Sequence, residues 1–173
     1  MIDAYLSDPA LPSWLLTSVP HAVMLALLCL LLTMLRRWPV GYAVVLWPGT
    51  VAHELLHYIA GALTGARPVG MSLVPRRQAD GSWELGSVAF ARLRWWNSVP
   101  VGLAPMALLP AGGWVWIESL SWPLLSDGST GLKFAAAQCL LAGWPSQRDW
   151  THAIIGLMMI GVLALLGWWL TTF

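Results

Sequence analysis

Two histidines and a glutamate lie within one helical turn of each other in an apolar part of the chain. His53 and His57 are four residues apart, and Glu54 follows His53 directly. Residues four apart share a face of an α-helix, so the two imidazoles can converge on one Zn²⁺ ion. Glu54 lies about 100° further round the helix, where its carboxylate can act as general base instead of as a ligand. The spacing predicts zinc ligands at His53 and His57 and a catalytic base at Glu54.

The apolar setting strengthens this interpretation. A carboxylate and two imidazoles inside a membrane helix cost several kcal/mol unless they are paired or bound to a metal. The alternative is a polar cluster in which the same side chains only form hydrogen bonds across a helix interface. We favour metal binding and keep the polar cluster as the competing hypothesis.

A catalytic zinc site needs a third protein ligand and one open position. The candidates in the sequence are Asp149, Asp127, Glu118 and His152. In the topology inferred below, Asp149 and His152 lie on the same side of the bilayer as the inner end of the helix that carries His57. Asp127 and Glu118 lie on the other side. We therefore predict Asp149 as the third ligand, with Asp127 and His152 as rivals.

Asp149 also has a purely structural interpretation. Ser146 precedes it by three residues, which is the spacing of a capping box at the beginning of a helix. Because one carboxylate seldom reaches both a backbone N–H and a metal, we expect capping and ligation by Asp149 to exclude each other.

The composition is that of a membrane protein. Hydrophobic residues make up 58% of the 173 residues and charged residues 10%, and the mean hydropathy is +0.67. Soluble domains carry roughly a quarter of charged residues. Many of the 13 tryptophans stand near the ends of apolar runs, where the indole suits the headgroup layer. The bilayer is thus a predicted partner, and a net charge of +1 gives no indication of a nucleic-acid partner.

Four apolar runs reach the length of about 20 residues that a membrane-spanning helix needs. They are residues 14–35, 41–63, 97–117 and 150–172. The run 131–144 is shorter, and forms either a short, partly re-entrant helix or the end of a broken helix that begins near Ser119. The sequence predicts a mainly α, polytopic membrane protein with four to five transmembrane helices, organised as a single domain over residues 1–173.

Residues 66–96 have a different pattern. Two β-prone runs flank a basic segment that contains Asp80-Gly81, and Asp-Gly between such runs is typical of a β-hairpin turn. We predict a membrane-associated β-hairpin between the second and the third span.

The distribution of basic residues predicts the orientation. With the N-terminus in the cytoplasm, six arginines lie inside and three basic residues lie outside, provided that residues 119–144 cross the bilayer. The inner ones are Arg67, Arg76, Arg77, Arg92, Arg94 and Arg148, and the outer ones are Arg36, Arg37 and Lys133. This arrangement places the histidines nearer the cytoplasmic side, and we expect the cytoplasmic (inner) membrane of a prokaryote.

With His53-Glu54-x-x-His57 inside an apolar helix, the chain resembles the site-2 protease family of intramembrane zinc metalloproteases. That family places HExxH in one transmembrane helix and a membrane-associated β-hairpin after it. Its third zinc ligand is an aspartate near the beginning of a later transmembrane helix. The order of these features is similar here. The resemblance covers roughly residues 41–172, with 14–35 as an added helix.

The sequence departs from the family pattern around its aspartate. The family's aspartate usually stands in a Leu-Asp-Gly context preceded by an Asn-Pro element, whereas Asp149 lies between Arg148 and Trp150. Asp127 does precede a glycine, which keeps it as a rival. Asn97, with the proline-rich run after it, is the candidate for a displaced Asn-Pro element.

The resemblance implies an intramembrane zinc metalloendopeptidase that cleaves transmembrane or membrane-proximal segments of membrane proteins. An edge strand of the 66–96 hairpin could hold the substrate extended by strand addition. The alternative is a non-proteolytic membrane metal-binding or scaffold protein, against which Glu54 argues, because a pure metal site needs no such carboxylate. Gln138 either lines the site or bonds across helices. The sequence leaves the oligomeric state open.

Overall fold

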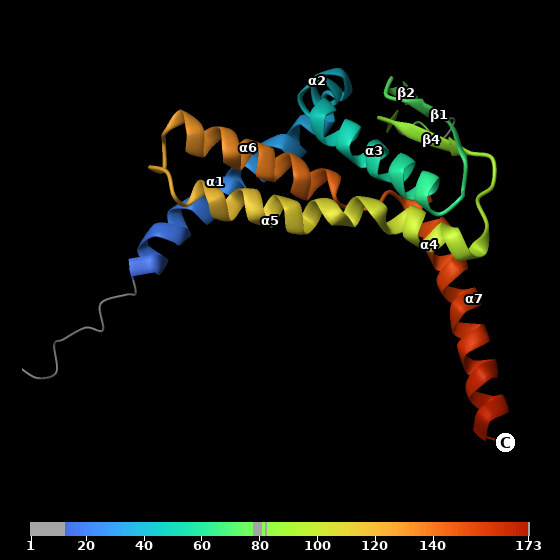
Figure 1. The fold of residues 1–173 in the computed structure, drawn as a ribbon. Helices are drawn as coiled ribbons and strands as arrows, with labels where there is room; N and C mark the ends of the chain where they lie inside the picture. The colour runs from blue at the N-terminus through green and yellow to red at the C-terminus, as the bar shows by residue number, and fades with distance from the viewer. Residues whose placement is uncertain (1–12, 78–80, 82, 173) are drawn as a thin grey trace, which may run out of the picture.

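The computed structural model describes residues 13–77, 81 and 83–172, and this part of the chain is mainly helical (Figure 1). The helical elements are α1 (Ser13–Met34), η1 (Leu35–Arg37), α2 (Pro39–Val45), α3 (Trp47–Leu63), α4 (Trp95–Leu103), η2 (Ala104–Ala107), α5 (Leu108–Ser119), α6 (Asp127–Ala142) and α7 (Gln147–Thr172). The strands are β1 (Pro68–Ser72), β2 (Arg76–Arg77), β3 (Trp83–Glu84) and β4 (Ser87–Phe90).

Three helices in the described part of the chain are long and apolar enough to cross a membrane, fewer than the four to five predicted. They are Leu16–Met34, Trp95–Ser119 and Gln147–Thr172. These match the predicted runs 14–35, 97–117 and 150–172. The prediction of a span is wrong for the run 41–63, and the run 131–144 forms the shorter of its two alternatives.

The predicted span 41–63 is interrupted at Leu46. Helix α2 ends before this residue and α3 begins after it, with Pro48 in the first turn of α3. Proline lacks an N–H and its ring collides with the carbonyl four residues earlier, which kinks or breaks a helix, and here the helix is interrupted. The 17 residues of α3 extend about 26 Å, which is shorter than the roughly 30 Å of hydrocarbon in a bilayer.

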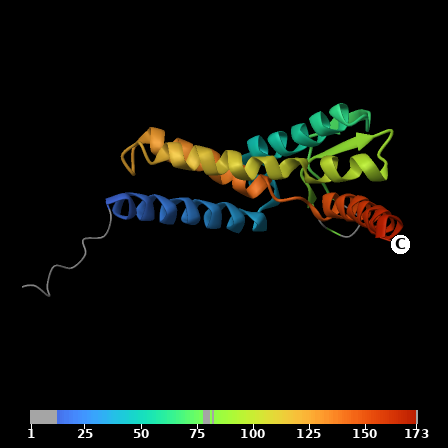
Figure 2. The ribbon, with the colours of Figure 1, turned by 60° about the horizontal axis from the view of Figure 1, so that its bottom comes forward.

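The predicted run 131–144 belongs to a separate helix of 16 residues, α6, which begins at Asp127. Of the two alternatives for this run, the short helix is observed. It lies antiparallel along α5 (Figures 1 and 2): the Ser129 hydroxyl donates to the Ser119 carbonyl at 3.2 Å, and Gly112 of α5 lies against Cys139. The other face of α6 packs on α1 and on the α2–α3 junction, where the buried apolar core lies.

The predicted β-hairpin is present and is small. Strand β1 pairs antiparallel with β4, with Met71 opposite Val88, and β2 pairs with β3, with Arg76 opposite Glu84. Gly81 has a positive φ of 85°, as the predicted turn requires, whereas Asp80 lies outside the described residues. The hairpin lies beside α3 (Figure 1).

The end of α3 reverses the direction of the chain, so that the strands that follow lie beside α3. Gly65 has a φ of 74°, its N–H donates to the Ala62 carbonyl, and the Ala66 N–H donates to the Gly61 carbonyl at 2.8 Å. This pair of bonds is a Schellman motif, which only a residue tolerant of positive φ allows. Phe90 of β4 then packs directly on Gly61, where a Cβ atom would overlap its ring.

Helix α4 packs antiparallel against the N-terminal half of α7. Two glycines allow the close approach: a Cβ at Gly102 would lie 2.7 Å from the Asp149 carbonyl oxygen, and one at Gly156 would lie 2.5 Å from the Ser98 hydroxyl. The first turn of α7 is thereby held beside the end of α4 and in front of α3. Beyond this crossing α7 extends away from the other helices with exposed apolar side chains (Figure 1).

Candidate metal centre

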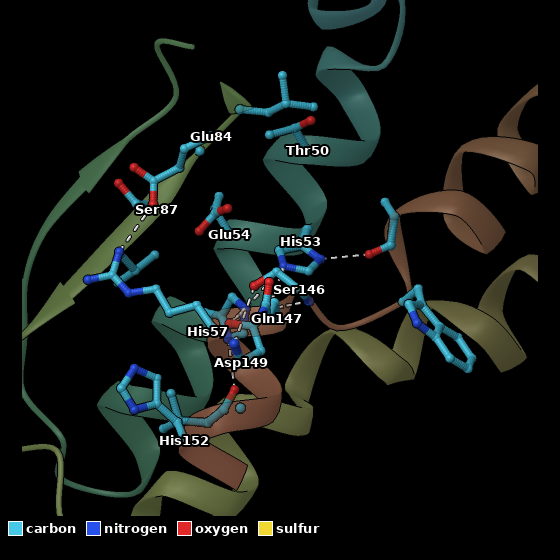
Figure 3. A pocket seen from close by; sticks show the side chains of 18 of the residues that line it. Thr50, His53, Glu54, His57, Glu84, Ser87, Ser146, Gln147, Asp149 and His152 are labelled. Atoms are coloured by element: carbon cyan, nitrogen blue, oxygen red, sulfur yellow. Dashed lines mark hydrogen bonds and ion pairs between the residues drawn. The ribbon is translucent and has the colours of Figure 1, made fainter. Parts of the chain in front are cut away.

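Two side chains of α3 and one of α7 meet at a single point (Figure 3). The Nε2 atoms of His53 and His57 are 3.1 Å apart. Asp149 places Oδ1 3.1 Å from the His57 Nε2 atom and Oδ2 3.4 Å from the His53 Nε2 atom. In the part of the chain that the structure describes, these are the only three His, Cys, Asp or Glu side chains that come together closely enough to hold a metal ion.

Backbone carbonyls fix the orientation of both imidazoles. The His53 Nδ1 atom lies 2.6 Å from the Ala142 carbonyl oxygen, and the His57 Nδ1 atom lies 2.7 Å from the Val101 carbonyl oxygen. A carbonyl only accepts, so each Nδ1 must carry a proton and donate it. In a neutral ring this leaves a lone pair on Nε2. The same carbonyl contact is typical of histidines that bind a metal through Nε2.

The donor set fits a zinc ion. With both rings neutral, two Nε2 lone pairs and a carboxylate point at one another, which is repulsive unless a cation lies among them. For tetrahedral zinc with bonds of 2.0–2.1 Å, the ligand atoms are about 3.3 Å apart. The two Nε2 atoms are 3.1 Å apart, and with one carboxylate oxygen as the third ligand atom all three lie within 4.8 Å of one another, so a small adjustment would bring them to this geometry. The competing polar cluster requires instead that one imidazole carry two protons and donate from Nε2 to Asp149.

Asp149 caps α7 and faces the histidines at the same time. Its Oδ2 atom accepts the Ser146 N–H at 2.7 Å, and its own N–H donates to the Ser146 hydroxyl at 3.3 Å. The cap therefore does not draw the carboxylate away from the histidines, and whether it coexists with ligation stays a prediction. The cap fixes the carboxylate through one oxygen and leaves Oδ1 beside His57.

The rival ligands stand apart from this cluster. Asp127 is at the opposite end of α6 from Ala142, about 22 Å along the helix axis. Glu118 is at the end of α5, which lies beside the beginning of α6 and is equally remote from the histidines. His152 lines the same cleft but is not part of the three-residue group. The structure thus brings Asp149 to the histidines, and its role as a metal ligand stays a prediction.

Glu54 lies beside the histidines on the face of α3 that the hairpin covers (Figure 3). Its side chain is buried, and within the described residues no hydrogen bond reaches its carboxylate. Gly86, between β3 and β4, packs against it: a Cβ there would lie 2.6 Å from the Glu54 Cγ atom and 2.8 Å from Oε1. The carboxylate is therefore oriented by packing while its oxygens remain available to accept a proton.

A cleft of about 1210 Å³ opens over these residues. Its walls are α3, the hairpin segment 83–90 and the beginning of α7. Strand β4 pairs with β1 along one edge and, among the described strands, has no partner along the other. The Arg148 guanidinium of α7 bonds to the Glu84 carboxylate of β3 at 3.1 Å and joins two walls of the cleft.

Several features of the site have no signal in the sequence. The carbonyls of Ala142 and Val101 belong to the backbone, which every residue has, so the sequence does not distinguish them from other carbonyls. Gly86 has a weak signal, because a glycine beside a strand often marks a close approach of other groups. Asn97, the candidate for an Asn-Pro element, does not line the cleft. It accepts the Arg94 N–H at 2.7 Å and joins the hairpin to α4.

The chain matches no protein-family model, no curated protein and no solved structure. The resemblance to site-2 proteases therefore stays a prediction from the motif, and the geometry of His53, His57 and Asp149 is the ground for any assignment of function.

Proposed function

We propose that this chain is an intramembrane zinc metallopeptidase of the site-2 protease type. The proposal depends on one observation above all. Both histidines turn Nε2 towards the same carboxylate while a backbone carbonyl contacts each Nδ1 atom. Three apolar helices long enough to cross a membrane support a location in the bilayer. We extend the proposal to the cytoplasmic membrane of a prokaryote, with the site nearer the cytoplasm. The count of basic residues that predicted this orientation assumed that residues 41–63 and 119–144 both cross the bilayer, and neither segment holds a helix of spanning length in the described part of the chain.

The residues have separate roles in this proposal. His53, His57 and Asp149 would hold a zinc ion, which when bound would supply a water activated for attack on a peptide carbonyl at neutral pH. Glu54 accepts a proton from that water and returns it to the nitrogen of the leaving amine. One water is consumed, the C–N bond breaks, and a carboxylic acid and an amine are released. Burial of Glu54 against Gly86 aims its oxygens into the cleft.

The cleft suits an extended peptide. A helical substrate hides its carbonyls in hydrogen bonds, so the segment to be cleaved must unwind first. The residues of β4 line the cleft, and its second edge, which pairs with no other described strand, offers backbone donors and acceptors to an added strand. The substrates in this proposal are transmembrane or membrane-proximal segments of other membrane proteins.

A substitution at Glu54 tests the proposal. In purified protein, Glu54→Gln should keep about one zinc per chain and lower peptide cleavage in proteoliposomes by a factor of 10² or more, because it removes the general base. Glu118→Gln is the matched control, because Glu118 is far from the cleft, and it should cleave at the wild-type rate.

Two results would contradict the proposal in different ways. Wild-type protein prepared without chelator and free of metal would support the polar cluster instead. Wild-type protein that holds zinc but cleaves no membrane-protein segment would support the non-proteolytic metal-binding or scaffold alternative.

A further inference from the structure

We propose that Gln138 is a positioning residue for the metal centre. Its side-chain amide fixes the junction of α2 and α3 on α6, and this contact sets the position of His53 relative to Asp149. The inference rests on the proposed metal site and adds a residue of α6 that the HExxH motif does not contain.

The amide of Gln138 replaces a missing backbone hydrogen bond. In an uninterrupted helix the Gly49 N–H would donate to the Val45 carbonyl, four residues earlier. At the α2–α3 junction the Gly49 N–H donates instead to the Gln138 Oε1 atom at 3.3 Å, and the Gln138 Nε2 atom donates to the Val45 carbonyl at 2.9 Å. One side chain thus satisfies both groups that the break leaves open.

The contact is close and buried, so it tolerates little displacement. Gln138 is 5% exposed. A Cβ at Gly49 would lie 2.9 Å from the Gln138 Oε1 atom and 3.1 Å from the Ala142 Cβ atom, so a larger residue would have to displace the Gln138 amide and push α3 from α6. Buried backbone groups left without partners are costly in apolar surroundings. The amide therefore ties the two helices together in one register.

This register continues into the metal centre. His53 lies one turn after Gly49 on α3, and Ala142 lies one turn after Gln138 on α6. These two residues form the next contact, through the His53 Nδ1 atom and the Ala142 carbonyl. Helix α6 then ends, and residues 143–146 lead to Asp149, which faces the histidines. Displacement at Gln138 would therefore be transmitted to the ring orientation of His53 and to the distance between His53 and Asp149.

Cobalt binding measures this effect without reference to cleavage. Wild-type protein and Gln138→Met, which keeps a side chain of similar length but lacks the amide, are purified in detergent, stripped of metal and titrated with Co²⁺. Their visible d–d absorption is recorded. We expect the variant to bind Co²⁺ at least about tenfold more weakly, the lower end of the range for losing a group that orients a ligand. We also expect its d–d bands to differ from those of the wild type.

Two further variants make the result decisive. Gly131→Ala on the same helix adds a Cβ that meets nothing within 4 Å, and it should bind Co²⁺ as the wild type does. Gly49→Ala disturbs the same contact from α3 and should weaken Co²⁺ binding in the same direction. If Gln138→Met does not fold, the Co²⁺ affinity of Gly49→Ala is the measurement that tests the inference.

The outcomes separate this inference from the proposed function. If Gln138→Met folds and has the Co²⁺ affinity and spectrum of the wild type, the inference about Gln138 fails while the metal site stands. If Gln138→Met does not fold, wild-type Co²⁺ affinity and spectrum in Gly49→Ala lead to the same conclusion. A wild-type chain that binds no Co²⁺ overturns the metal site itself. If the wild type binds Co²⁺ but its zinc form cleaves no peptide, only the peptidase proposal fails.

Discussion

At the scale of single residues, the tautomers of two histidines give the site its chemistry. The Ala142 and Val101 carbonyls each contact one Nδ1 atom, so both Nε2 atoms turn towards Asp149, and in a neutral ring each Nε2 carries a lone pair. Asp149 is in turn held by the Ser146 N–H through one carboxylate oxygen. Ring orientation and carboxylate orientation are thus fixed before any ion binds. Preorganisation of this kind strengthens metal binding, because fewer side chains must be ordered when the ion enters.

Asp149→Asn tests the predicted third ligand. Asparagine keeps an oxygen that can accept the Ser146 N–H but loses the negative charge and one ligand oxygen. We expect zinc affinity, measured by titration of metal-free protein, to fall by more than about 100-fold, beyond the effect of losing an outer group. The free energy of unfolding of the metal-free protein should change by less than about 1 kcal/mol, because the cap is retained.

Asp127→Asn is the matched control for the rival ligand. Asp127 is at the end of α6 that is remote from the histidines, so the Asp127→Asn variant should bind zinc with the affinity of the wild type. Loss of zinc from Asp127→Asn with retention by Asp149→Asn would reverse the assignment.

At the scale of elements, the hairpin and α7 complete a site that α3 only begins. Phe90 packs β4 on Gly61 of α3, and this contact brings Gly86 against Glu54. The close crossing of α4 and α7 at Gly102 and Gly156 carries Asp149 to the other side of the histidines. The general base is thereby aimed by the hairpin and the third ligand is supplied by the last helix.

Gly86→Ala tests whether the hairpin orients the general base. The added Cβ would lie 2.6 Å from the Glu54 Cγ atom, so either Glu54 or the hairpin segment must shift. We expect peptide cleavage to fall by roughly 10- to 100-fold, since misplacement of a catalytic group by about 1 Å has an effect of this order. The zinc content should stay the same, because no ligand is displaced.

Gly70→Ala in β1 provides the comparison, because the added Cβ meets nothing within 4 Å. It should cleave at the wild-type rate. Equal activity of Gly86→Ala and Gly70→Ala would show that the hairpin contact does not orient Glu54.

At the scale of the whole molecule, the metal centre joins helices that are distant in sequence. Helix α3 supplies both histidines, α4 and α6 hold their Nδ1 protons through carbonyls, and α7 supplies Asp149. An ion bound at this point would link all four helices in the folded state. Because the unfolded chain lacks such a preformed site, zinc binding should contribute directly to the free energy of folding.

Removal of zinc should therefore lower the thermal stability of the purified protein in detergent. Zinc present at about 100 times its dissociation constant adds roughly 2.7 kcal/mol to the free energy of unfolding. We expect treatment with a chelator to lower Tm and added zinc to restore it. The double variant His53→Ala/His57→Ala should show no dependence on zinc. An identical Tm for wild-type protein with and without zinc would contradict the link between metal binding and folding.

Local patterns in the sequence determined much of this protein. The four-residue spacing of His53 and His57 put both on one face of α3, because α-helical periodicity depends only on residue separation. Of the four apolar runs of spanning length, three correspond to helices long and apolar enough to cross a membrane, and the β-prone runs on either side of Asp80-Gly81 predicted the hairpin. These features could be read from the chain because each depends on neighbouring residues.

The tertiary structure decided the rest. Pro48 was visible in the sequence, but only the packing of α3 on α6 shows that the chain breaks there and that Gln138 satisfies the open backbone groups. Among four candidate third ligands, only Asp149 reaches the histidines, because α7 crosses α4 at two glycines distant in sequence. Contacts between segments that are remote in sequence depend on how the helices pack, and so do the positions of the backbone carbonyls that orient the histidines. No local sequence pattern encodes that packing.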